Sequence, residues 1–104
     1  MTKREQNTIF EAIAKTITNK YDERIVVDFE NGDTLLVDFS NTGEPFETDA
    51  IAVYSLQRPI HDENGKWKGT DEIDYGSYTQ YSELYDFIIR IMNQRPGTLY
   101  IDSF

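Results

Sequence analysis

The strongest structural signal in this chain is a pair of short segments in which every second residue is apolar. The segments cover residues 24–29 and 34–39, with the apolar sets Ile25, Val27, Phe29 and Leu35, Val37, Phe39. A period of two residues is typical of a β-strand that buries one face. Because the two segments follow each other so closely, they predict an antiparallel β-hairpin.

The length of the hairpin turn follows from the need to keep both apolar sets on one face. A three-residue loop, Glu30-Asn31-Gly32, pairs Ile25 with Val37. A two-residue Asn-Gly loop would instead pair Ile25 with Asp38 and mix the faces. Since a slip of one residue turns every side chain to the other face, we expect the three-residue loop, with Gly32 at positive φ.

Two other segments repeat apolar residues at helical spacing. The first helix is predicted to end at Tyr21-Asp22 and the second at Pro96-Gly97. The second helix is predicted to begin in a capping box formed by Ser77 and Gln80. The apolar positions are Ile9, Phe10, Ile13, Ala14 and Ile17 in the first helix, and Tyr78, Tyr81, Leu84, Tyr85, Ile88, Ile91 and Met92 in the second. We expect at least two of the three tyrosines of this second stripe to pack in the core.

A second hairpin is predicted between the two helical segments. A third strand runs from residue 50 to residue 57, or as far as His61. The turn Glu63-Asn64-Gly65 repeats the pattern of the first turn and brings His61 near Trp67. Pro59 has no backbone N–H, which indicates a sheet edge or a bulge at its position.

These elements predict a single acidic α+β domain that spans residues 1–104. Residues 40–49 are turn formers and form a loop, and residues 98–101 form the last strand. The order is α-β-β-β-β-α-β, with two helices on one face of an antiparallel sheet of four to five strands. The expected core contains Phe10, Ile13, Ile17, Val27, Phe29, Val37, Leu84, Ile88 and Ile91.

Negative charge is concentrated in the first hairpin and the segments around it. The chain has a net charge of −9, and residues 22–57 hold nine acidic residues against Arg24 alone. Nucleic-acid affinity comes largely from lysine and arginine that neutralise phosphates, so direct binding of DNA or RNA is disfavoured. We expect a protein partner with a basic surface.

Residue patterns that carry catalysis or cofactor binding are missing from the sequence. There is no cysteine, no phosphate-binding glycine motif and no serine-nucleophile motif. His61 is the only histidine, and its neighbours Asp62 and Glu63 are adjacent only in sequence. A calcium loop counted from Asp62 fails because Trp67 occupies the position that requires glycine. We therefore expect a protein that is not an enzyme and that holds no cofactor or metal ion.

The sequence also bears on where the chain works. No apolar stretch approaches the length of a membrane span, and the N-terminal residues lack an apolar signal segment. An aromatic content of 13% argues against disorder, because each ring buries a large apolar area. We expect a folded, cytoplasmic protein without a membrane partner.

Two groups of residues are candidates for partner binding. The acidic group is Asp28, Glu30 and Asp38 on the outward face of the first hairpin, together with Asp71, Glu72 and Asp74. The aromatic group is Tyr75 and Trp67. Exposed tyrosine and tryptophan beside acidic residues are common in protein interfaces.

The chain resembles small acidic inhibitors from phages and mobile elements in its size, its acidity and its lack of catalytic motifs. These include nucleic-acid mimics of the anti-restriction and anti-CRISPR type. The resemblance implies an inhibitor or decoy whose carboxylates occupy the basic surface of a nucleic-acid-binding protein. The alternative is an adaptor or immunity-type module that binds another protein through its exposed aromatic residues.

Overall fold

The computed structural model describes residues 2–18, 23–39 and 50–103. The elements are α1 (Lys3–Thr18), β1 (Glu23–Phe29), β2 (Thr34–Phe39), β3 (Ala52–His61), β4 (Trp67–Tyr78), α2 (Tyr81–Gln94) and β5 (Gly97–Ser103). The strands form one antiparallel sheet in the order β4-β3-β2-β1-β5. This confirms the predicted α+β class and element order. The predicted loop at residues 40–49 lies outside the described residues.

The first turn has the predicted length and register. Ile25 pairs with Val37 across β1 and β2. The amide of Phe29 donates to the carbonyl oxygen of Asp33 at 2.9 Å and closes the three-residue loop. Gly32 has a φ of +95°, so a glycine is needed at the position where the sequence places one.

We expect Gly32→Val to lower the free energy of unfolding by about 1 kcal/mol or more, because a β-branched residue resists positive φ. Gly32→Asn is the matched control, since asparagine tolerates positive φ better than valine does. We expect this variant to lose less of the free energy of unfolding. Urea unfolding of both variants measures the difference. Equal losses would show that the turn does not depend on this backbone conformation.

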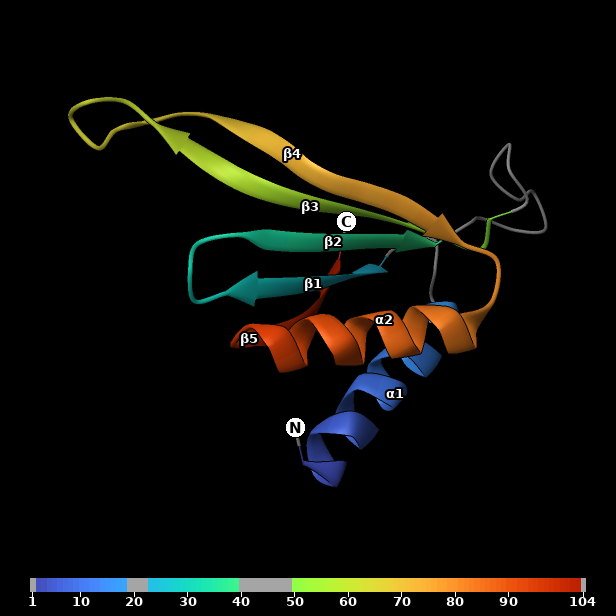
Figure 1. Ribbon diagram of the computed structural model, residues 1–104. Coiled ribbons are helices and arrows are strands. Elements are labelled where there is room, and N and C mark those ends of the chain that lie inside the picture. Colours follow the sequence, from blue (N-terminus) through green and yellow to red (C-terminus); the bar gives the residue numbers. More distant parts are fainter. Residues whose placement is uncertain (1, 19–22, 40–49, 104) are drawn as a thin grey trace.

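Both helices pack on the same face of the sheet, as predicted (Figure 1). The buried cluster contains Ile9 and Ile13 of α1, Leu84, Phe87, Ile88 and Ile91 of α2, and the inward residues of the central strands, Ile25, Val27, Phe29, Leu35, Val37, Phe39, Ala52 and Leu56. Ile17 was also predicted to lie in the core, but its side chain lies outside the described part of the structure. Tyr78, Tyr81 and Tyr85 are half-buried and pack against the cluster, which confirms that at least two of the three tyrosines pack in the core.

The prediction that Phe10 is buried in the core is wrong. Its side chain is 62% exposed. Ile9 and Ile13 are four residues apart and lie on one side of α1, and they alone of the described α1 side chains are buried in the core cluster. Phe10 lies at the flank of the helix, where its ring meets Tyr85 of α2 edge-on, with 6.0 Å between ring centroids.

The predicted capping box at Ser77 and Gln80 is also wrong. Ser77 and Tyr78 still belong to β4, where they pair with Val53 and Ala52, and α2 begins at Tyr81. The cap residue Gln80 makes no side-chain hydrogen bond to the helix. Sheet pairing thus extends β4 through the residues at which a capping box would have started the helix, and tertiary structure overrides the local signal.

The β3–β4 hairpin extends past the end of the neighbouring strand β2. Thr34, the first residue of β2, pairs with Gln57 of β3, so beyond that point β3 is paired only with β4. We call residues 58–70 the arm, which projects beyond the β1–β2 turn (Figure 1). His61 pairs with Trp67 as predicted, and Pro59 lies between two register irregularities, which confirms the expected edge or bulge.

Candidate functional site

The sheet has one face that the helices leave uncovered (Figure 1). Side chains alternate between the two faces of a strand, and the register places one residue from each strand in a central row on the uncovered side. This row is Tyr100, Val26, Leu36, Ser55 and Tyr75, from β5 across to β4. We call this side the open face.

Carboxylates outnumber basic groups on the open face. Among the described strand residues of this face, the charged ones are Arg24, Asp28, Asp38, Glu72 and Asp102. Arg24 lies beside Asp102, with 3.7 Å between the guanidinium and the carboxylate. That pair offsets one of the four carboxylates and leaves the face negative. Such a surface attracts a basic partner over several ångströms.

The two ends of the central row are tyrosines. Tyr75 is 73% exposed and Tyr100 is 42% exposed, while Val26 between Tyr100 and Leu36 is buried. Desolvation, and then its hydrogen bond to Asp28, raises the pKa of Tyr100. Asp28 also accepts a hydrogen bond from the Thr34 hydroxyl at 3.3 Å. The open face therefore combines acidic and aromatic groups, which is a composition suited to protein recognition.

The structure distributes the predicted partner-binding residues over four places. Asp28, Asp38, Glu72 and Tyr75 share the open face, and Glu30 lies on the β1–β2 turn. Asp71 and Asp74 pair with Arg58 and Leu56 on the helix side of the sheet. Trp67 lies on the arm and is 60% exposed. The eight residues thus do not form one patch.

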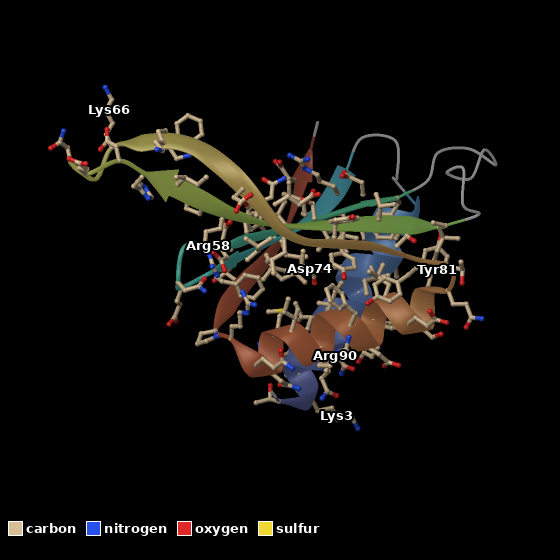
Figure 2. All side chains as sticks on the ribbon, turned by 45° about the horizontal axis from the view of Figure 1, so that its top comes forward. Lys3, Arg58, Lys66, Asp74, Tyr81 and Arg90 are labelled. Atoms are coloured by element: carbon tan, nitrogen blue, oxygen red, sulfur yellow. The ribbon has the colours of Figure 1, made fainter. Side chains whose placement is uncertain are left out.

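Asp74 has a local structural role on the helix side of β4 (Figure 2). Its carboxylate accepts hydrogen bonds from the Tyr54 hydroxyl at 3.4 Å and from the Tyr75 amide at 2.9 Å. Burial, and then the negative charge of Asp74, raises the pKa of Tyr54. Asp74 is therefore engaged within the domain on the helix side of the sheet. On the open face, Asp28 likewise accepts hydrogen bonds from Thr34 and Tyr100, and both carboxylates remain exposed.

A buried charge cluster around Asp33 was not predicted from the sequence. This residue is 2% exposed. Arg58 donates two hydrogen bonds of 2.9 Å to its carboxylate, and Arg95 donates one of 3.0 Å. The hydrogen bonds from Arg58 are the main cause of a lowered pKa for Asp33. The cluster joins the β1–β2 turn, the base of the arm (Figure 2) and the end of α2.

Three further residues of the open face were not predicted from the sequence: Tyr100, Asp102 and Arg24. A usable signal was present, because Thr98, Tyr100 and Asp102 alternate with Leu99 and Ile101. That period of two residues assigns the polar set to the face away from the helices. The missing information was which strand pairs with residues 98–102, and this depends on the sheet order.

An apolar groove lies between the two helices. It has a volume of about 510 Å³ and is lined by Asn7, Phe10, Ile13, Ala14, Tyr81, Ser82 and Tyr85. Among the described residues, no three histidine, aspartate or glutamate side chains are placed to share a metal ion. Neither described helix is long and apolar enough to cross a membrane. The open face holds four of the eight predicted binding residues, more than any other surface of the described chain.

No family model, curated protein or solved structure matches this chain. The surfaces of the molecule are therefore the basis on which its function is inferred.

Proposed function

We propose that the protein binds a partner with a basic surface through its open face, as a non-enzymatic inhibitor or decoy of a nucleic-acid-binding protein. The observation that carries the proposal is the position of Asp28, Asp38 and Glu72, which lie on three different strands of the uncovered side of the sheet. A rigid sheet holds these carboxylates in fixed relative positions. A fixed array of negative charge can occupy a groove that is built to bind phosphates.

The tyrosines on the same face support a protein partner in particular. Tyr75 and Tyr100 supply apolar area at opposite ends of the central row. Tyrosine contributes large contact area at a small cost in conformational entropy. Charge would accelerate the encounter, and the aromatic ends would slow dissociation.

Affinity capture on the immobilised protein tests this proposal. Three proteins are compared: the wild type, an open-face variant (Asp28→Lys, Asp38→Lys and Glu72→Lys) and a control variant (Glu11→Lys, Glu83→Lys and Asp86→Lys). The control makes the same change in net charge at exposed positions on the helices.

We expect the wild type and the control to retain a partner that duplex DNA or RNA elutes, and the open-face variant to lose it. Capture that is equal for both variants, or a partner that nucleic acid does not displace, would contradict the proposal.

The exposed aromatic residues favour a second candidate function, an adaptor or immunity-type module. Trp67 lies on the arm, beyond the part of the sheet that contains the central row, and is 60% exposed. Binding through such an anchor would depend little on salt. We expect Trp67→Ala to abolish capture in this case, while the open-face variant would bind like the wild type.

A further inference from the structure

The two edges of the sheet differ in how well they are protected against pairing with another strand. β4 forms one edge, and its register with β3 is interrupted twice. It carries Asp71, Glu72 and Asp74, and the Asp74 carboxylate accepts the hydrogen bond of the Tyr75 amide. Bulges, charges and occupied amides are the features that keep an edge strand from pairing. β4 is a blocked edge.

β5 forms the other edge and lacks these features. All seven of its residues, from Gly97 to Ser103, pair with β1 in a regular register. Its single charged residue is Asp102, which lies beside Arg24 of the neighbouring strand. A regular edge with so little charge is a template for a further strand.

The direction of the free backbone groups on β5 follows from one hydrogen bond. Residues of an antiparallel pair alternate between those that bond to the neighbouring strand and those whose backbone groups point away. The amide of Glu30 donates to the carbonyl oxygen of Pro96 at 3.0 Å. Residues that bond to β1 recur at every second position after Pro96, so Tyr100 also bonds to β1. The backbone groups of Leu99 and Ile101 therefore point away from the sheet.

We propose that β5 pairs with β5 of a second copy of this chain, antiparallel about a two-fold axis at Tyr100. Residue 100 is the midpoint of the strand, so this pairing aligns all seven residues. It brings the free backbone groups of Leu99 opposite those of Ile101 in the second copy, so that each amide meets a carbonyl. A pairing shifted by one residue would place free groups opposite bonded ones.

The side chains match across the same axis. Leu99 and Ile101 are half-buried on the helix side of the sheet. In the proposed dimer, Leu99 of each copy lies opposite Ile101 of the other, which extends the apolar layer from one copy to the next. On the open face, Tyr100 meets Tyr100 of the second copy, and Thr98 meets Asp102. Aromatic pairs and hydroxyl–carboxylate pairs both stabilise neighbouring strands. A closed two-fold contact of this kind is self-complementary.

Pairing through β5 doubles the mass of the particle and also enlarges the open face. It joins two five-stranded sheets into one continuous face, with Asp28 and Asp102 of both copies close to the central tyrosine pair. The candidate binding surface would then contain residues from both chains. The inference itself does not depend on the proposed function, because no partner is needed for the chain to self-associate.

Cysteine cross-linking tests the register, and the absence of native cysteine makes the result unambiguous. In the proposed dimer, residue 100 is its own partner in a non-hydrogen-bonded pair, where Cα atoms lie about 4.5 Å apart, within the range for a disulfide. We expect Tyr100→Cys to form a covalent dimer under mild oxidation. The matched control Thr98→Cys, which also lies on the open face of β5 but faces Asp102, should remain a monomer on a denaturing gel. Cross-linking of both variants alike, or of neither, would overturn the proposed pairing.

A second pair of variants tests the role of the backbone groups. Ile101→Pro removes an amide that points away from β1, so it leaves the β1–β5 ladder intact, whereas Ile101→Ala removes the same side chain and keeps the amide. By sedimentation velocity we expect the wild type and Ile101→Ala to show twice the monomer mass, and Ile101→Pro to be monomeric with an unchanged circular dichroism spectrum. A monomeric wild type, or a dimeric Ile101→Pro, would refute the inference.

Discussion

Asp33→Asn is expected to lower the free energy of unfolding by roughly 2–3 kcal/mol. The carboxylate is 2% exposed and accepts hydrogen bonds from Arg58 and Arg95, so an amide of the same shape loses its charge partners without leaving a cavity. The loss stays below that of a fully buried ion pair because both arginines are partly exposed. For a domain of this size the melting temperature should fall on the order of 10 °C.

The same variant should also change how stability depends on pH. The pKa of Asp33 is lowered from its ordinary value of 3.8, chiefly by the hydrogen bonds from Arg58. Its stabilising contribution is therefore complete above that ordinary value and is lost as the pH falls through the lower, folded pKa. Urea unfolding near neutral pH and near pH 3 measures this, and Asp33→Asn should lose less stability over that interval than the wild type.

Asp71→Asn is the matched control for the Asp33 experiments, because this carboxylate is exposed. Its unfolding should be indistinguishable from that of the wild type. If Asp33→Asn were equally harmless, the cluster would not hold the arm and α2 to the β1–β2 turn.

The open-face variant (Asp28→Lys, Asp38→Lys and Glu72→Lys) is expected to associate with its partner at least about 10-fold more slowly than the wild type. Its three carboxylates lie on three strands of one face. Reversing them replaces attraction by repulsion over the whole approach path. Folding should be nearly unaffected, since Asp28 and Glu72 are exposed and Asp38 is only half-buried. Stopped-flow or biosensor kinetics measure the association rate.

Salt provides an independent check of the same idea. Exposed charges separated by more than about 10 Å are screened at 0.1 M salt. The association rate of the wild type should therefore fall steeply as salt is added, and that of the open-face variant should not. The control variant (Glu11→Lys, Glu83→Lys and Asp86→Lys) has the same net charge as the open-face variant. If it slowed association equally, overall charge rather than the open face would govern the encounter.

The first hairpin could be predicted in detail because its signals agree. The alternation in residues 24–29 and 34–39 and the glycine of the turn all require the same register. The second hairpin was predictable for the same reason, since Glu63-Asn64-Gly65 repeats the turn chemistry. When all local signals favour the same register, no alternative pairing competes with it.

The start of α2 could not be predicted because two local readings competed. Ser77 and Gln80 have the spacing of a capping box, yet Ser77 and Tyr78 pair with β3 and remain in β4. Phe10 was misplaced for a related reason. Its spacing fits the apolar stripe of the helix, but only the approach of α2 decides which side of that stripe is covered.

The candidate site was predictable only in part. Asp28 and Asp38 follow from strand periodicity. Glu72 and Asp74, however, lie on opposite faces although they are two residues apart, because of a register irregularity between Leu56 and Gln57 of β3 that no local pattern indicates. In the Asp33 cluster, Arg58 follows Asp33 by 25 positions in the sequence and Arg95 follows it by 62. Contacts over such separations depend on the sheet order, which the sequence pattern did not determine.

Methyl resonances of the protein, recorded during titration with the captured partner, test the central claim most directly. Val26, Leu36 and Val53 carry their methyl groups on the open face, whereas Ala14 lines the groove between the helices and Ile60 lies on the arm. We predict that the signals of Val26, Leu36 and Val53 shift or broaden on binding, while those of Ala14 and Ile60 stay in place. Shifts confined to Ala14 or to Ile60 would place the partner on the helix groove or the arm, and would contradict binding through the open face.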